Sequence, residues 1–198
     1  KKAAPDSIHF KAVCDTYQGY IARAKDKVNT VWGNTPDTYV DYRELLADKS
    51  IDAVFIMTPE HLHHSMTIAA LNAGKHVYIE KPLAKTIEQG WEIIKAWQKS
   101  GKIVQVGTQN RSSSLYKKAK ELVEQGLIGD VHYVRAYWYR NSPPKEPAWR
   151  YNIPAEAAES NTDWKRFLGP APTRPFDKRR YFQWRLYRDY SGGISTDL

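Results

Sequence analysis

The sequence has a single cysteine, Cys14, among its 198 residues. One thiol cannot form a disulfide within the chain, and it cannot supply the several thiolates of a structural zinc site. Disulfide scaffolds and cysteine-rich zinc domains are therefore excluded. The compartment stays open between the cytoplasm and the periplasm, because larger exported proteins need no disulfide.

Long apolar runs are also missing. The most apolar stretches, such as residues 51–59, are far shorter than the roughly 20 residues that a membrane-spanning helix needs, so no span is predicted. Apolar residues make up 41% of the chain and charged residues 26%, which is enough to bury a core and close to the globular average. Disordered, collagen-like and coiled-coil classes are excluded.

Acidic residues are fewer than basic ones. There are 22 Asp and Glu against 30 Lys and Arg, which gives a net charge of +8. Such an excess of positive charge can support binding of nucleic acid, binding of phosphate-bearing cofactors, or solubility alone. Only the distribution of the charges along the chain can distinguish these functions.

The first half of the chain alternates strand and helix patterns. Strand patterns fall at residues 8–14, 51–57, 76–79 and 103–106, and helical patterns at 17–27, 41–48, 61–73 and 86–100. This alternation is typical of a parallel α/β sheet. The apolar run at 51–57 indicates a strand covered on both faces. Gly74 is expected to cap the C-terminal end of the helix at 61–73.

The composition changes after Gly107. Residues 108–198 hold 15 of the 25 aromatics and 7 of the 11 prolines. A helical pattern at 115–125 precedes the alternating run 131–139, which predicts a long strand of an antiparallel sheet. The proline-rich stretch 141–180 predicts an irregular excursion with one short helix near 162–167.

We therefore predict two domains in an α/β chain. Residues 1–107 form an incomplete Rossmann-type parallel sheet, and residues 108–198 begin an α+β domain with a mainly antiparallel sheet.

The glycine-rich loop of dinucleotide-binding folds, G-x-G-x-x-G, is another absence. In such folds an acid at the end of the second strand accepts the ribose hydroxyls, and the glycines precede it by about 20 residues. Asp15 fits the acid, but only 14 residues precede it. The phosphate loop is therefore expected outside this chain. An Asp after a strand is by itself more often a turn or cap residue.

Three further polar segments follow predicted strands. They are Thr58–His63, Glu80–Pro82 and Gly107–Arg111. Taken singly, each reads more simply as a helix start or a solvated turn, and the histidines read as ordinary helix-start residues rather than metal ligands. Because the carboxyl ends of parallel strands meet at one edge, where ligands of open α/β sheets bind, their joint placement favours a ligand site.

Five stretches of the chain carry a family resemblance: TPEHLHH, AGKHVYIEKPLAKT, VGTQNR, DWKRFLGPAPTRPF and WRLYRDYSGGISTDL. With them, the chain resembles the Gfo/Idh/MocA family of glucose-fructose oxidoreductase, inositol dehydrogenase and rhizopine-catabolism proteins. AGKHVYIEKPLA is the most specific motif. The resemblance implies an NAD(P)-dependent oxidoreductase of sugars or polyols, with NAD favoured by Asp15, and a homo-oligomeric parent enzyme.

The resemblance also implies the site residues. The cofactor would contact Asp15, Thr58, Pro59, Glu60, His61, His63, Glu80, Lys81, Gln109, Trp164 and Arg166. The catalytic set would combine Lys81 with a D-x-x-x-H pair after a Gly-Gly step, and Asp197 matches its aspartate. The histidine would fall beyond Leu198. We therefore expect a piece of a longer enzyme that is inactive and binds NAD weakly on its own.

The chemistry implied for these residues is hydride transfer. Oxidation of a carbinol requires a base at the hydroxyl, and Lys81 can serve if burial and neighbouring cations lower its pKa. Trp184 and Arg185 are expected to form the sugar pocket, through ring stacking and hydrogen bonding respectively. No metal is implied.

Two other functions compete with this interpretation. Some relatives use bound NAD to oxidise a sugar transiently and then eliminate a glycosidic substituent. Basic and aromatic residues also alternate over 178–188, as in single-stranded nucleic acid platforms, although acids flank them and no nucleic-acid motif is present. We expect a carbohydrate substrate rather than nucleic acid or a membrane.

Overall fold

The computed structural model describes residues 8–137, 139, 142, 143, 145 and 148–197, apart from the side chains of Ser195 and Asp197. It contains two parallel sheets. Their strands are β1 (Ala12–Cys14) and β2 (Asp37–Tyr39) in the first, and β3 (Ala53–Ile56), β4 (His76–Ile79) and β5 (Val104–Val106), in that order, in the second. The predicted parallel α/β class is confirmed.

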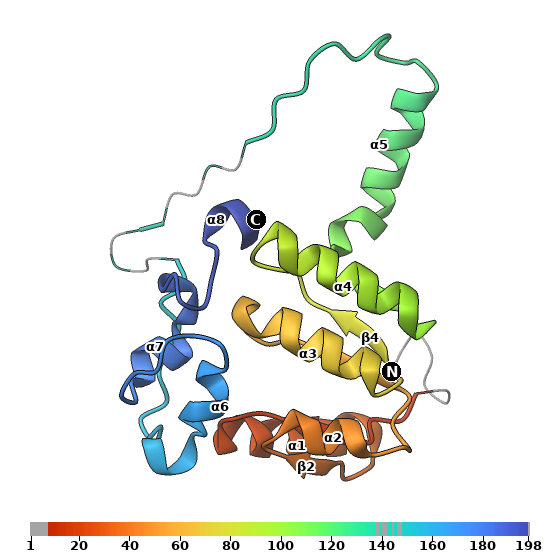
Figure 1. The fold of residues 1–198 in the computed structure, drawn as a ribbon. Coiled ribbons are helices and arrows are strands. Elements are labelled where there is room, and N and C mark those ends of the chain that lie inside the picture. Colours follow the sequence, from red (N-terminus) through yellow and green to blue (C-terminus); the bar gives the residue numbers. More distant parts are fainter. Residues whose placement is uncertain (1–7, 138, 140–141, 144, 146–147, 198) are drawn as a thin grey trace.

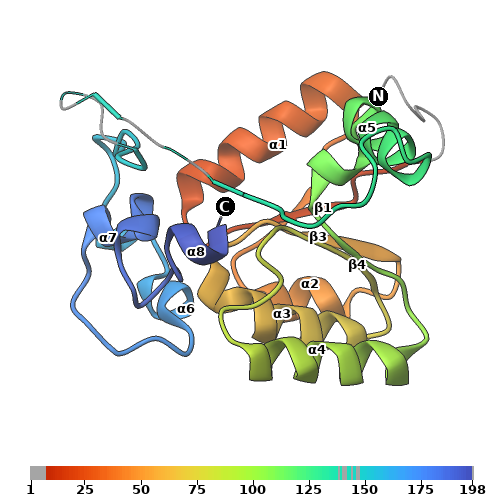
Figure 2. The ribbon, with the colours of Figure 1, turned by 90° about the horizontal axis from the view of Figure 1, so that it is seen from above.

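Four helices alternate with the strands, as their patterns predict. They are α1 (Gln18–Trp32), α2 (Tyr42–Ala47), α3 (Glu60–Asn72) and α4 (Ile87–Ser100). Helix α1 lies on one side of the strands and α2, α3 and α4 on the other (Figure 2). The side chains of Asp41 and Thr86 cap α2 and α4 by accepting backbone N–H groups. The C-cap of α3 is Ala73, and Gly74 follows it at φ 74°.

One apolar core lies between β3–β5 and the helices α3 and α4, which run side by side (Figure 1). Strand alternation sends Ile56, Val77 and Ile79 into this core. It sends Phe55 to the opposite face, where the ring is 57% exposed. The expectation that β3 is covered on both faces is therefore wrong for the described part of the chain.

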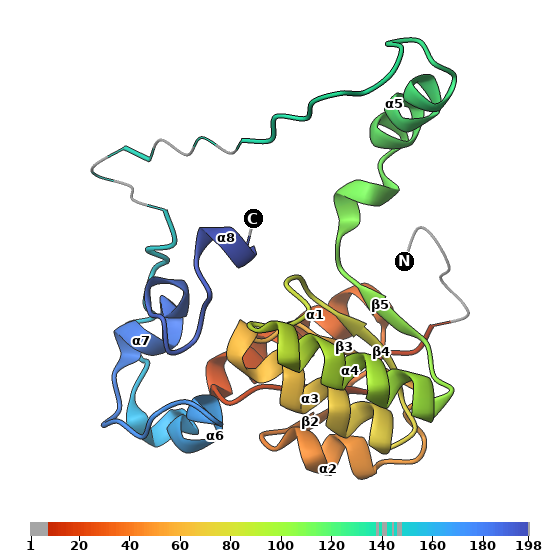
Figure 3. The ribbon, with the colours of Figure 1, turned by 45° about the horizontal axis from the view of Figure 1, so that its top comes forward.

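Beyond β5 a short 3-10 turn, η1 (Gln109–Ser112), leads to helix α5 (Ser114–Glu124). Helix α5 projects from the body and has no buried residue (Figure 3). The predicted strand at 131–139 is not formed: residues 131–137 and 139 have no regular secondary structure and are exposed. A strand needs a neighbour for its backbone hydrogen bonds, and no described segment pairs with this one.

Residues 151–194, here called the C-terminal lobe, have short helices and an aromatic core. The elements from this point on are η2 (Glu159–Asn161), α6 (Trp164–Leu168), α7 (Lys178–Phe182), η3 (Trp184–Leu186) and α8 (Ile194–Asp197). Helix α6 matches the predicted short helix; α7 and η3 were not predicted. The lobe packs on the start of α1, where Tyr17 joins the aromatic core and pairs with Thr162 (Figure 1).

None of the helices in the described part of the chain is long and apolar enough to cross a membrane.

Candidate functional site

The carboxyl ends of β3, β4 and β5 lie next to one another. The N–H of Glu80 donates to the carbonyl of Ile56 at 3.0 Å, and the N–H of Gly107 donates to that of Ile79 at 2.8 Å. The three polar segments that follow these strands are therefore brought together at one edge, the place where ligands bind in open α/β sheets.

His63 joins two of these segments. Its ring is 1% exposed, with Nε2 at 2.8 Å from the Thr58 carbonyl and Nδ1 at 2.6 Å from the Pro82 carbonyl. Pro59, the residue after Thr58, is the N-cap of α3. His63 thus holds the loop after β3 against the loop after β4, while its predicted cofactor contact stays a prediction.

Glu80 and Lys81 follow β4 directly. Glu80 Oε2 accepts the N–H of Lys81 at 3.2 Å, both side chains are half-buried, and the Lys81–Pro82 peptide is cis. A Cβ at Gly107 would lie 2.7 Å from the hydroxyl oxygen of Tyr78 and 3.0 Å from Glu80 Oε1. Glycine at this position therefore leaves the space that the Glu80 carboxylate occupies.

Glu60 is buried at the start of α3, with 1% of its surface exposed. Its Oε1 accepts the Ser191 hydroxyl at 2.7 Å, and its Oε2 accepts the Gly192 N–H at 2.7 Å and the Thr196 hydroxyl at 3.3 Å. Hydrogen bonds to a carboxylate are among the stronger ones. Glu60, predicted to line the cofactor, thus fixes the Gly-Gly segment that leads to Asp197.

His61 is also buried and also joins α3 to the lobe. Its Nε2 donates to the Phe167 carbonyl at 2.8 Å, its backbone N–H donates to the Tyr190 carbonyl at 3.2 Å, and its ring packs on both aromatic rings. Burial lowers the pKa of His61 to about 4, so the ring is neutral near pH 7. The role observed for this residue is in packing, while its predicted cofactor contact stays a prediction.

Asp15 follows β1, at the carboxyl end of the other sheet. Its Oδ1 accepts the Tyr17 N–H at 2.9 Å and the Tyr181 hydroxyl at 3.0 Å, and the Thr16 hydroxyl lies 2.8 Å from that of Tyr181. Burial raises the pKa of the Asp15 carboxyl above its ordinary value, and these two hydrogen bonds offset part of the rise. Tyr181 lies 166 residues away in sequence, so no local pattern could have indicated it.

Arg166 approaches the ends of β1 and β2 from the lobe. Its guanidinium donates to Asp41 Oδ2 at 3.1 Å and pairs with Asp163. Trp164 is 7% exposed, and its indole N–H donates to the Arg174 carbonyl at 2.7 Å. Of the predicted W-x-R pair, the arginine lies at the carboxyl end of β2, beside Asp41, whereas the tryptophan belongs to the aromatic core.

The remaining predicted residues have simpler surroundings. Gln109 is exposed at the start of η1. Trp184 and Arg185 in η3 are half-buried, with the guanidinium 4.1 Å from the centre of the indole ring. Asp197 ends α8, but its side chain lies outside the described atoms. In the described part of the chain no three His, Cys, Asp or Glu side chains are grouped as metal ligands.

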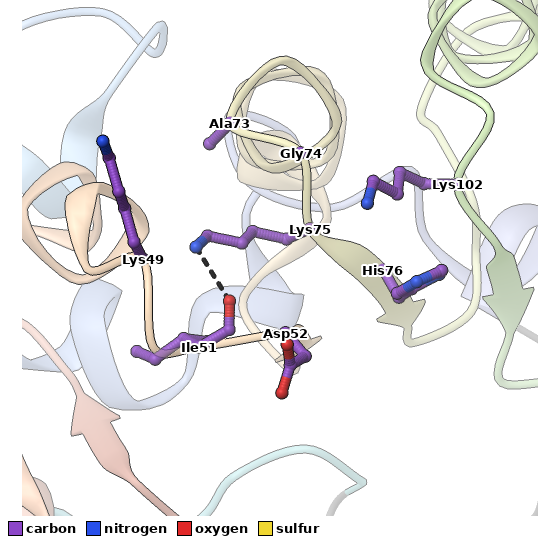
Figure 4. A pocket seen from close by; sticks show the side chains of 8 residues that line it. All are labelled: Lys49, Ile51, Asp52, Ala73, Gly74, Lys75, His76 and Lys102. Atoms are coloured by element: carbon purple, nitrogen blue, oxygen red, sulfur yellow. Dashed lines mark hydrogen bonds between the residues drawn. The ribbon is translucent and has the colours of Figure 1, made fainter.

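A cavity of about 380 Å³ lies at the opposite, amino ends of the β3–β5 strands (Figure 4). Lys49, Lys75 and Lys102 line it. Lys75 is 4% exposed, and its ammonium donates to the carbonyls of Asp48 at 2.6 Å and Ile51 at 2.8 Å. This lysine ties together the turn before β3, and the cavity is remote from the predicted site.

The fold and the site together define a dinucleotide-binding α/β protein, and comparison with known proteins agrees. Residues 2–108 match the family described as the oxidoreductase family with an NAD-binding Rossmann fold, GFO_IDH_MocA. The chain belongs to this family.

Two relatives and one solved structure illustrate the match. Inositol 2-dehydrogenase from Salmonella paratyphi B is 36% identical over 140 residues, which cover 70% of this chain and 40% of the relative. Alpha-N-acetylgalactosaminidase from Shewanella oneidensis is 33% identical over 137 residues, 67% of this chain and 30% of the relative. The crystal structure of myo-inositol 2-dehydrogenase from Lactobacillus plantarum superposes with a TM-score of 0.58 at 31% identity, covering 64% of this chain and 36% of that one.

The residues at the carboxyl edge fit an NAD molecule. The Asp15 carboxylate, which accepts the Tyr17 N–H and the Tyr181 hydroxyl on Oδ1, has further acceptor capacity for a ribose hydroxyl. Glycine at position 107 lets the Glu80 carboxylate keep its place at this edge, because a Cβ there would collide with it. The chain spans only 40% of the inositol 2-dehydrogenase that it matches, so the activity of the whole protein is taken up as a proposal below.

Proposed function

We propose that the whole protein transfers a hydride between NAD and a hydroxyl-bearing carbon of a sugar or polyol. The observation that carries the proposal is the meeting of the Thr58–His63, Glu80–Pro82 and Gly107 segments at one sheet edge in a chain of the NAD-binding oxidoreductase family. Asp15 binds the adenosine ribose, and Glu80 and Lys81 face the nicotinamide end. NAD is favoured over NADP, because the Asp15 carboxylate repels a 2′-phosphate.

Bound NAD supplies the hydride acceptor. The hydroxyl proton must leave as the hydride leaves the same carbon, and Lys81 is the proposed acceptor of that proton. Asp197 is the second member of the proposed catalytic set. Asp197 lies in helix α8. This helix is anchored because Thr196, the residue directly before Asp197, donates a hydrogen bond to the buried Glu60.

Trp184 and Arg185 are proposed to bind the substrate. A sugar or polyol ring offers C–H faces that pack on aromatic rings and hydroxyls that bond to guanidinium groups. The Arg185 guanidinium lies over the Trp184 indole, 4.1 Å from the ring centre, so both kinds of group lie at one place in η3.

The direct test is NAD reduction by the whole protein with a panel of polyols and sugars, myo-inositol among them. We expect Lys81→Met to lower kcat by at least about a hundredfold, because a methionine accepts no proton. Lys95→Met, an exposed position on α4, is the matched control and should keep wild-type rates. Equal rates for the two variants would exclude Lys81 as the base.

A second candidate is a glycosidase that oxidises a sugar transiently with bound NAD and then eliminates the glycosidic substituent. It is favoured by the likeness to alpha-N-acetylgalactosaminidase from Shewanella oneidensis. Release of an aglycone without net NADH would support it. Stoichiometric NADH with a polyol and no aglycone release would exclude it.

Nucleic acid binding by residues 178–188 is less well supported. Tyr181 and Phe182 are buried, and the chain's own Arg180 lies 4.4 Å from the centre of the Tyr187 ring. A buried ring offers no face on which a base can stack.

A further inference from the structure

The hydroxyl of Tyr181 lies where the C-terminal lobe meets the end of β1. It donates to Asp15 Oδ1 at 3.0 Å and lies 2.8 Å from the Thr16 hydroxyl. A carboxylate only accepts, so the single hydrogen of Tyr181 goes to Asp15 and the hydrogen of Thr16 goes to the Tyr181 oxygen. Burial, and then the charge of Asp15, raise the pKa of Tyr181, which keeps its hydroxyl protonated.

The position of this hydroxyl is set by the lobe. The Tyr181 side chain is 5% exposed, and its ring packs against those of Phe167 and Phe182, with centres 4.5 Å and 4.8 Å away. Helix α7, which holds Tyr181, is capped by Asp177, whose side chain accepts two backbone N–H groups.

The strand end opposite is tied to the same lobe. The N–H of Asp163 donates to the Thr16 carbonyl at 2.7 Å, and Tyr17 and Thr162 form an antiparallel bridge. The lobe therefore contacts the chain on both sides of the Tyr181–Asp15 hydrogen bond, and this hydrogen bond restrains the orientation of the Asp15 carboxylate.

We propose that Tyr181 is a positioning residue of the dinucleotide site, which fixes Asp15 Oδ1 so that Oδ2 faces the adenosine ribose. The preference for NAD over NADP then depends on the C-terminal lobe as well as on Asp15. This inference rests on the proposed function, because it needs the ribose at Asp15. A hydrogen bond to a charged group that fixes one rotamer favours the ligand that needs this rotamer.

The test measures the dissociation constants of NAD and NADP by calorimetry on the whole protein, for the wild type and for Tyr181→Phe. Loss of the hydroxyl should weaken NAD about tenfold, whereas NADP, which gains nothing from an ordered carboxylate, should change by less than about twofold. Tyr187→Phe removes a hydroxyl from the same lobe and should leave both constants unchanged.

A second variant, Thr16→Val, removes the donor to Tyr181 with little change in volume, and it keeps the test informative if Tyr181→Phe does not fold. It should weaken NAD by about threefold and again spare NADP. Equal weakening of NAD and NADP would overturn the inference in favour of a purely structural role, and so would no change in either. If the wild type binds NAD, only this inference falls with those results; if it binds neither cofactor, the proposed function falls as well.

Discussion

Glu60 and His61 are neighbours at the start of α3, and their buried side chains are held by residues more than 100 positions away. The motif they belong to was predicted to line a cofactor. Their observed hydrogen bonds go to the C-terminal lobe, through Ser191 and Phe167, and the cofactor contacts stay a prediction. For single residues such as Glu60 and His61, the sequence predicted their position after a strand. It could not predict their hydrogen-bond partners, which lie more than 100 residues away.

Protonation of His61 should weaken the fold in mild acid. Its pKa is about 4 in the folded chain against an ordinary 6.5, so between these values the unfolded chain binds a proton that the folded chain does not. The free energy of unfolding therefore falls as pH falls through this window, by about 2 kcal/mol from this group between about pH 7 and about pH 5.

Urea unfolding of His61→Gln at both pH values measures this effect. Glutamine keeps an N–H donor for the Phe167 carbonyl but does not titrate. The variant should lose about 2 kcal/mol less than the wild type between the two pH values. An identical loss in both proteins would show that His61 does not contribute to the acid sensitivity.

Helix α8 and the Gly-Gly segment before it depend on Glu60. The Glu60 carboxylate accepts hydrogen bonds from three donors. In Glu60→Gln an NH2 group faces at least one of these donors, so the variant should lower the free energy of unfolding by about 2 kcal/mol. Glu124→Gln is the matched control, because its exposed pair with Lys120 contributes less than about 0.5 kcal/mol. Thermal melts that shift equally in the two variants would contradict the anchoring role.

Gly107, which follows β5, lies too close to Glu80 to carry a side chain without displacing it. In Gly107→Ala the new Cβ would displace the ends of Tyr78 and Glu80, which are flexible enough to move at little cost in stability. We expect NAD affinity to fall about fivefold, the loss of about one hydrogen bond. Gly90→Ala on α4 meets no atom within 4 Å and should stabilise the helix by about 0.5–1 kcal/mol while binding NAD normally. An unchanged NAD affinity in Gly107→Ala would remove Glu80 from the site.

Elements that are set by local pattern were the most predictable ones. The strands β3, β4 and β5 and the helices α3 and α4 follow from apolar runs, 3.6-residue spacing and caps such as Thr86 and Gly101. Strand β2, with only three residues, was missed, and the strand at 131–139 was predicted but is not formed. Both errors concern segments whose structure depends on a neighbouring strand rather than on their own sequence.

At the scale of the whole molecule, two cores meet near the carboxyl ends of the strands. One core lies between β3–β5 and the helices on one face, and the other is the aromatic core of the C-terminal lobe. His61 links them through Phe167, and Phe167 packs on Tyr181, which reaches Asp15. These contacts connect the carboxyl ends of the two sheets through the C-terminal lobe, and they support the proposal that Asp15 and the Glu80–Lys81 pair belong to one site.

The most direct measurement is a crystal structure of the whole protein with NADH. The ribose hydroxyls should lie within hydrogen-bond distance of Asp15 Oδ2, with the nicotinamide beside Glu80 and Lys81 at the ends of β4 and β5. A dinucleotide bound elsewhere, for instance in the lysine-lined cavity at the amino ends of the strands, would contradict the account.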